Sequence, residues 1–214
     1  MLLLTISRQY GAGGSAVAAR VAERLGWRVV DNELVERVAT RAGLAPQEVA
    51  DREERVPTFI ERLARTIVAA TPELVVPPEV GGTLDGLTES DLVRLTERVV
   101  QEIAQEGRVV FVGRAAPAVL ARERDALHVK LVAPRDHRIR VAAERLGMSL
   151  DDAAKVVDET DRNRARYHRE YYDRDWHDPA NYHLTINTGA LGIDGATEVV
   201  VGEVERRKSV NSEQ

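Results

Sequence analysis

Hydrophobic residues occur along the chain in short runs that alternate with longer helical patterns. Five runs predict strands, near residues 2–6, 27–30, 108–112, 127–132 and 182–187. Between them, apolar residues recur every three or four positions, a spacing typical of amphipathic helices. Strands that alternate with helices predict an α/β fold whose parallel sheet is covered by helices on both faces.

Several residues mark where the predicted helices begin and end. The first helix stops at Gly26, and Pro134 begins another that stops at Gly147. Ser149 has the position of an N-cap and opens a long helix that reaches about Tyr172. Further predictions are helices over residues 116–123 and 196–207 and a frayed tail over residues 208–214.

The middle of the chain has a different pattern. Residues 44–106 lack strand signals, and their helical patches lie at 45–54, 57–70 and 90–105. Prolines and glycines crowd residues 71–87, which predicts a loop. This block is too small for a convincing core of its own. We therefore expect a single domain over residues 1–207 that carries a helical insert over about 44–106.

Composition narrows the possible functions. The 214 residues carry a net charge of −5, which argues against a broad nucleic-acid footprint. The absence of cysteine excludes disulfides, thiolate catalysis and cysteine-based zinc sites. The apolar run at the start is too short for a signal peptide or a membrane span. These features predict a cytoplasmic protein without membrane or nucleic-acid partners, and they leave the oligomeric state unknown.

A glycine-rich loop follows the first predicted strand and leads into the first helix. It consists of Gly11, Ala12, Gly13, Gly14 and Ser15, and is called the glycine loop below. Glycines let a backbone approach an anion closely, and the first turn of a helix offers unpaired amides. The order of strand, glycine loop and helix is therefore typical of a phosphate-binding site.

The glycine loop departs from the P-loop pattern G-x-x-x-x-G-K-[ST]. Gly14 stands where the lysine belongs and Arg8 where the first glycine belongs. No lysine precedes Lys130, so none lies near the glycine loop in sequence. From this stretch alone, a tight turn without a ligand remains an alternative to a phosphate site.

Two other groups of residues could serve a ligand. Asp31 follows the second strand, where it would cap the next helix or meet a ligand at the edge of the sheet. Arg162 and Arg166 share a helical face, and Asp161 and Arg164 lie on a neighbouring one. Such arginines either bind anions or form a solvated face with weak ion pairs.

Several stretches together resemble the cytidylate kinase-like family, which is similar to the P-loop nucleoside monophosphate kinases. They are Ile6–Ser15, Val29–Leu34, Val112–Arg114, Asp161–Ala165, Trp176–Leu184 and Leu191–Ala196. The resemblance implies a P-loop kinase-like fold with a five-stranded parallel sheet in the order 2-3-1-4-5. It also implies a lid segment, over about residues 151–176, that closes over the site.

The same resemblance implies roles for single residues. The glycine loop would hold the phosphates of ATP, and the hydroxyl of Ser15 would face Mg²⁺. Asp31 would lie beside the acceptor, and Arg114 would contact the acceptor phosphate. Asp161 and Arg164 match an Asp-x-x-Arg pair that touches the acceptor's ribose and phosphate.

Three departures from cytidylate kinases qualify this picture. Gly14 replaces the P-loop lysine. Ala115 stands where those kinases have an aspartate that reads cytosine, and Val157 stands where they carry another lid arginine. The frame for binding phosphate is kept, but cytidine specificity does not follow.

The sequence thus predicts a kinase that uses ATP and Mg²⁺ and phosphorylates a small acceptor, with a nucleoside monophosphate such as CMP as the expected one. Arg114 and the lid residues Arg162, Arg164 and Arg166 would surround the transferred phosphoryl group. Arg8 would replace the missing lysine, or else cap its strand or pair with a carboxylate. The alternatives are a nucleotide-binding regulatory protein without turnover and a kinase of a non-nucleotide metabolite.

Overall fold

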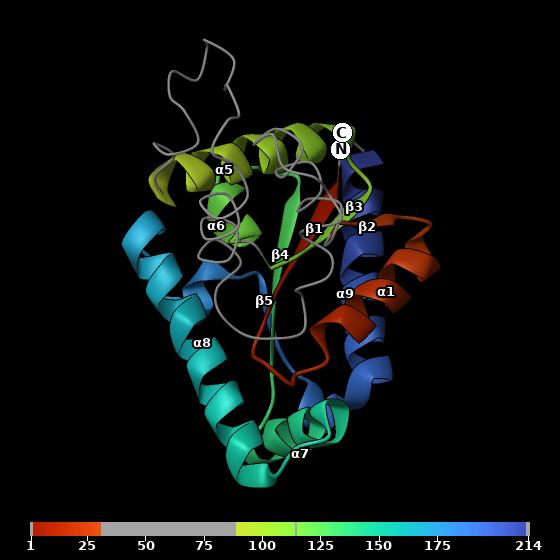
Figure 1. Ribbon diagram of the computed structural model, residues 1–214. Helices are drawn as coiled ribbons and strands as arrows, with labels where there is room; N and C mark the ends of the chain where they lie inside the picture. Colours follow the sequence, from red (N-terminus) through yellow and green to blue (C-terminus); the bar gives the residue numbers. More distant parts are fainter. Residues whose placement is uncertain (1, 31–88, 114, 213–214) are drawn as a thin grey trace, which may run out of the picture. The chain divides into compact units, whose positions relative to one another are not determined.

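The computed structural model describes residues 2–30, 89–113 and 115–212. The chain divides into two compact units, one of residues 1–30 with 103–214 and the other of residues 31–102. The first unit contains a five-stranded parallel sheet in the order β2-β3-β1-β4-β5 (Figure 1). Its strands are β1 (Leu3–Arg8), β2 (Arg28–Val30), β3 (Val109–Val112), β4 (Ala126–Val132) and β5 (Leu184–Asn187). The predicted fold class and strand order are confirmed.

Strand β1 lies at the centre of the sheet, between β3 and β4. Ile6 is in register with Val112 of β3 and Val129 of β4. Because all strands are parallel, their carboxyl ends share one edge of the sheet. The glycine loop leaves β1 at this edge, and Gly113 leaves β3 there.

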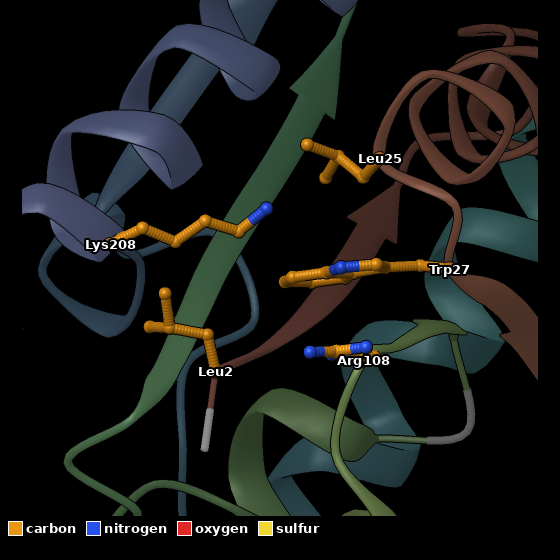
Figure 2. Close-up of a pocket in the computed structure, with 5 residues that line it drawn as sticks. All are labelled: Leu2, Leu25, Trp27, Arg108 and Lys208. Atoms are coloured by element: carbon orange, nitrogen blue, oxygen red, sulfur yellow. The ribbon is translucent and has the colours of Figure 1, made fainter.

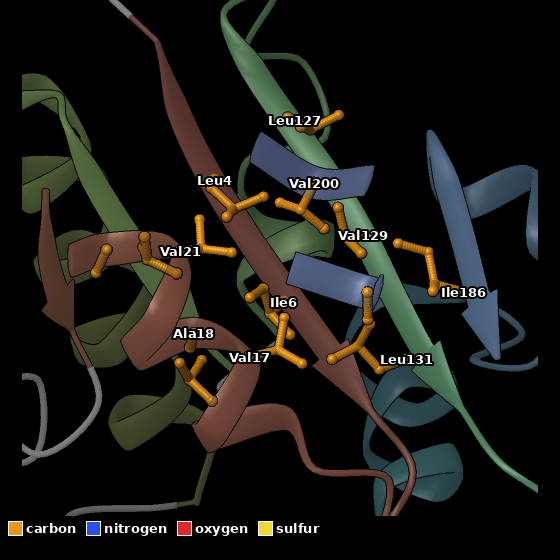
Figure 3. Close-up of a cluster of buried hydrophobic side chains, with 14 of the residues drawn as sticks. Leu4, Ile6, Val17, Ala18, Val21, Leu127, Val129, Leu131, Ile186 and Val200 are labelled. Atoms are coloured by element: carbon orange, nitrogen blue, oxygen red, sulfur yellow. The ribbon is translucent and has the colours of Figure 1, made fainter. Parts of the chain in front are cut away.

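Two helices, α1 (Gly14–Leu25) and α9 (Thr188–Ser212), pack side by side on one face of the sheet (Figure 1). Their apolar residues meet those of β1, β4 and β5 in the main hydrophobic core (Figure 3). The alternate residues Leu4 and Ile6 of β1 point into this core and are fully buried. Because this core buries aliphatic side chains of both β1 and α1, it holds these two elements in place and with them the glycine loop that connects them.

The other face of the sheet is covered by α6 (Ala116–Val119), α8 (Leu150–Tyr172) and the segment that follows α8 (Figure 1). Helix α7 (Arg135–Leu146) packs against α8 through a small cluster of Ile139, Ala142, Ala153 and Val157. Ser149 caps α8 by accepting a hydrogen bond from the Asp152 amide, as its position predicted.

Some boundaries differ from the predictions. Helix α6 ends at Val119 instead of residue 123, because Leu120 leaves the helical conformation at φ −99° and ψ 20°. Helix α9 begins at Thr188, is interrupted at Gly192, and continues to Ser212 where a frayed tail was predicted. Its last turns are held by Arg207, which donates to Glu203 and to the carbonyl of Ala126.

Helix α5 (Glu89–Glu106) matches the predicted helix over residues 90–105. Asp31, Arg114, the loop over residues 71–87 and most of the predicted insert lie outside the described residues. No described helix combines the length and the apolar character needed to cross a membrane.

Candidate active site

The glycine loop follows β1 and ends in the first turn of α1. Gly11 and Gly13 have φ values of 79° and 73°, in the left-handed region that glycine adopts without strain. A Cβ on Gly11 would lie 2.6 Å from the carbonyl oxygen of Arg138, so α7 approaches the loop closely. These glycines are therefore required by the backbone path.

The start of α1 offers hydrogen-bond donors to a ligand. Gly13 is the N-cap and has no side chain that could cap the helix. The Val17 amide is the one that bonds back to the Gly13 carbonyl, at 3.0 Å, so the amides just before it belong to the open first turn. The Ala12 amide instead donates to Gln9, at 3.2 Å. Ser15 is exposed beside the open turn.

Arg8 lies across the mouth of the glycine loop. A Cβ on Gly14 would lie 2.5 Å from the Arg8 Cγ, and a Cβ on Gly113 would overlap the Arg8 guanidinium. The side chain therefore runs from the first turn of α1 to the end of β3. Gly14 is the position where a P-loop has its lysine, so Arg8 fills the space that the lysine side chain would need.

The segment between β5 and α9 supports the loop from behind. The hydroxyl of Thr188 donates to the carbonyl of Ala12 at 3.0 Å. A Cβ on Gly13 would overlap the side chain of Ile193. These contacts hold the loop against the sheet.

Asp161 of α8 joins the lid segment to the glycine loop. Its carboxylate accepts hydrogen bonds from the Tyr10 amide at 2.8 Å and from Arg138 at 2.7 Å. Both side chains of the Asp161–Arg138 pair are buried, and Arg138 also donates to the carbonyls of Ala133 and Tyr10. A buried, fully hydrogen-bonded pair of this kind fixes geometry. The predicted contact of Asp161 with an acceptor ribose stays a prediction.

The lid arginines occupy different faces of α8. Arg164 is partly buried and donates to the backbone carbonyl of Arg8 at 2.8 Å. Arg162 and Arg166 are exposed, and Arg166 lies 4.0 Å from Glu170. The structure thus brings Arg8, Arg164 and Asp161 together at the glycine loop, with Arg162 and Arg166 on the outer faces of the helix.

One of the departures noted in the sequence, at Val157, has a structural explanation. Val157 is fully buried between α7 and α8, where an arginine would lose its hydration. Apolar packing between α7 and α8 therefore occupies the position where the resemblance implies another lid arginine. Ala115 is buried at the start of α6 with φ 52°.

A polar cluster lies beneath the lid segment, on the face of the sheet away from the main core. Ser7 of β1 is in register with Lys130 of β4, and both side chains are buried. Lys130 donates to the backbone carbonyl of Trp176, whose indole donates to the hydroxyl of Ser7 at 2.9 Å. Burial lowers the pKa of Lys130 to about 8, so at neutral pH the side chain is still mostly charged.

Two histidines on the same face are held neutral by burial. Burial lowers the pKa of His128 to about 4, and the nearby His183 adds to the effect. Burial, followed by the charge of Lys130, also lowers the pKa of His168 to about 4. The hydroxyl of Thr5 and Nδ1 of His128 share a hydrogen bond of 2.8 Å.

The described residues fit the phosphates of a nucleotide better than a resident metal. They contain no cluster of three or more histidine, aspartate or glutamate side chains that could hold a metal ion. Mg²⁺ in kinases is held largely by substrate phosphates, water and one or two protein oxygens. The exposed hydroxyl of Ser15 is compatible with that role, and the glycine loop is compatible with the phosphates.

Sequence reasoning missed three residues of this region. Arg138 and Lys130 are buried, and Arg145 of α7 donates to the Tyr10 hydroxyl, with its guanidinium 4.9 Å from the ring centroid. Arg138 lies 23 residues from its partner Asp161, a separation that no local pattern reveals.

A hollow of about 480 Å³ lies at the opposite edge of the sheet, where the strands begin (Figure 2). It is lined by Leu2, Leu25, Trp27, Arg108 and Lys208. The ammonium of Lys208 lies 5.4 Å from the Trp27 ring centroid. Because the glycine loop leaves the sheet at the other edge, this hollow is no part of the candidate site.

Solved structures with a similar fold support the architecture. The chain is similar to an uncharacterized protein from Eubacterium ventriosum, with a TM-score of 0.68, 19% identity and coverage of 96% of this chain and 99% of that one. It is also similar to a shikimate kinase from Bacteroides thetaiotaomicron, with a TM-score of 0.52, 13% identity and coverage of 95% and 98%.

Curated relatives and a family match address the chemistry. A cytidylate kinase from Natronomonas pharaonis is 26% identical over 207 residues, covering 95% of this chain and 89% of that protein. A cytidylate kinase from Thermococcus kodakarensis is 33% identical over 116 residues, covering 54% and 58%. The sequence model of the cytidylate kinase-like family matches residues 3–190. The chain therefore belongs to the cytidylate kinase-like family and is a nucleotide kinase, as its sequence motifs predicted.

Proposed function

We propose that this protein transfers the γ-phosphoryl group of ATP to the phosphate of a nucleoside monophosphate, with CMP as the first candidate. The observation that carries the proposal is the placement of Arg8. Its side chain lies between the start of α1 and the end of β3, in the space of the absent lysine. A cation at this place faces the phosphates that the glycine loop would hold.

The reaction needs positioning and charge stabilisation more than covalent chemistry from the protein. An oxygen of the acceptor phosphate attacks the γ-phosphorus in line, while the bond to the β–γ bridging oxygen breaks and ADP leaves. Amides of the glycine loop hold the donor phosphates, and Mg²⁺, when bound, neutralises their charge. Arg8 and Arg164 stabilise the charge on the phosphoryl group in transit.

The remaining predicted residues have roles on the acceptor side. Arg114 follows Gly113 directly in the sequence, and the guanidinium of Arg8 lies against Gly113. We assign Arg114, with Asp31, to the acceptor. Arg162 and Arg166 are exposed on α8 and would reach the phosphates only if the lid segment closes. Closure would also exclude water, which competes as an acceptor.

Two other functions remain open. A kinase of a non-nucleotide metabolite is favoured by Ala115, which lacks the carboxylate that reads cytosine in cytidylate kinases. A nucleotide-binding regulator without turnover is favoured by Gly14, which lacks the lysine. The paired placement of Arg8 and Arg164 argues for turnover, since binding alone does not require both.

The test is a phosphoryl-transfer assay with ATP, Mg²⁺ and a panel of nucleoside monophosphates and small hydroxylated compounds. We expect ADP release to depend on the acceptor and to be fastest with CMP. Gly13→Val should abolish ATP binding, because position 13 has a positive φ and no space for a side chain.

Each other outcome rejects part of the proposal. ATP binding without turnover would identify a regulator, and transfer only to a hydroxylated metabolite would identify the other class of kinase. Unchanged ATP affinity in Gly13→Val would show that the glycine loop is not the phosphate site.

A further inference from the structure

Lys130 is the most unusual charged residue of the described chain. It is 2% exposed and lies in the middle of the sheet, on β4 next to the central strand. No carboxylate within the described residues forms an ion pair with it. The charges of Asp161 and Asp175 raise the pKa of Lys130 and offset only part of the effect of burial, so burying this amine costs stability.

The surroundings of Lys130 indicate what it does. Its ammonium lies 3.9 Å from the ring centroid of Trp176 and 5.0 Å from that of Tyr182, where it interacts with both π faces. It donates to the backbone carbonyl of Trp176, which also accepts a hydrogen bond from the Tyr182 hydroxyl at 3.0 Å. Both aromatic residues belong to the segment that follows α8. Lys130 therefore attaches the end of the lid segment to the sheet.

The attachment extends to the residue before Arg8. The indole of Trp176 donates to Ser7, and Ser7 lies directly opposite Lys130 in the parallel register of β1 and β4. One position further along β1, the carbonyl of Arg8 accepts a hydrogen bond from Arg164 of α8. The lid segment is thus tied to the end of β1 at two adjacent residues, and Lys130 supports one of these ties.

We propose that Lys130 is a positioning residue that holds the end of the lid segment on β1, so that Arg8 and Arg164 face the same phosphate. This inference rests on the proposed function for its catalytic meaning. Lys130 would act by positioning other residues, because it is covered by Trp176 and Tyr182 and does not touch a substrate itself. A methionine or leucine would fill the space but could not hold the Trp176 carbonyl.

The test compares Lys130→Met with Lys155→Met. Both substitutions remove a lysine amine, but Lys155 is exposed on α8 and pairs with Asp152. In hydrogen–deuterium exchange, we expect peptides over residues 4–15 and 160–178 to exchange about fivefold faster or more in Lys130→Met. The same peptides should be unchanged in Lys155→Met. Unchanged exchange in Lys130→Met would overturn the inference.

Kinetics provide a second readout that a merely structural role would not move. Lys130→Met should lower kcat about tenfold or more, while KM for ATP changes less than about twofold. A fall in thermal stability with kcat preserved would reduce Lys130 to a packing residue. If the wild-type protein transfers no phosphoryl group to any acceptor, the proposed function fails, and the exchange experiment still decides whether Lys130 holds the lid segment.

A second variant, Ser7→Ala, keeps the test decisive if Lys130→Met misfolds. It removes the acceptor of the Trp176 indole within the same buried cluster and leaves the lysine amine in place. It should accelerate exchange in the same two regions, and the double variant should add little because both changes break one network. Independent, fully additive effects would contradict the proposed connection.

Discussion

The side chain of Arg8 lies against Gly14, in the space that a side chain at position 14 would need. This placement makes the role of Arg8 testable. Arg8→Ala should lower kcat about 100-fold or more, the size expected for losing one donor to transition-state charge. Thermal stability should change little, because the bond from Arg164 goes to the Arg8 backbone and survives the substitution. The measurements are steady-state kinetics and a thermal melt, with Arg20→Ala on the exposed side of α1 as the control. Equal activity would reject the idea.

The shared space also predicts a rescue. A lysine introduced at position 14 would collide with Arg8, whose Cβ and Cγ lie where the new side chain must start. Gly14→Lys alone should therefore lower activity. Combined with Arg8→Gly, which removes both of these atoms, it should recover at least about tenfold of the kcat lost in Arg8→Gly, because the lysine then supplies the missing cation. A double variant no better than Arg8→Gly would contradict this.

At the level of secondary-structure elements, α8 presents its arginines to different surroundings. Arg164 faces the glycine loop and Arg162 is exposed. Arg164→Ala should lower kcat about 10³-fold, the size seen for arginines that stabilise phosphoryl transfer. Arg162→Ala should have a smaller effect, because Arg162 is exposed to solvent. A change confined to KM would indicate uniform binding, and no change in either variant would return these arginines to a solvated helix face.

The elements show how far local sequence patterns reach. All five strands lie within two residues of their predicted ends at the carboxyl edge, because short apolar runs are a local signal. The helical residues 188–191 that precede the kink at Gly192 were not predicted, because the predicted helix began at residue 196. The Asp161–Arg138 pair was missed because its two residues come from different helices, α8 and α7. The sequence located the glycine loop and the arginines along the chain. Which of them lie in contact depends on tertiary packing, which local patterns do not reveal.

For the whole molecule, the two buried histidines predict sensitivity to acid. His128 and His168 bind a proton near pH 6.5 in the unfolded chain but only near pH 4 in the folded one. Between these values the unfolded state binds more protons, so the free energy of unfolding falls as pH is lowered. At pH 5 the expected loss is about 2 kcal/mol per histidine.

Denaturant unfolding between pH 7 and pH 5 measures this loss above the range of the carboxylates. His168→Gln should remove a large part of the pH dependence, since one of the linked protonations disappears, while His128 and His183, whose pKa burial also lowers, keep the remainder. His177→Gln is the matched control, because His177 is exposed at the end of the same region. A pH dependence that His168→Gln leaves intact would show that other groups cause it.

The main-chain conformation at Ala115 suits a different side chain better than alanine. At φ 52° this residue has a backbone conformation that costs most L-residues about 1 kcal/mol and that aspartate and asparagine adopt more readily than alanine. The resemblance to cytidylate kinases implies an aspartate at this position. The main chain at Ala115 therefore already has a conformation that suits a carboxylate side chain, and the single substitution Ala115→Asp is compatible with it without rebuilding the fold.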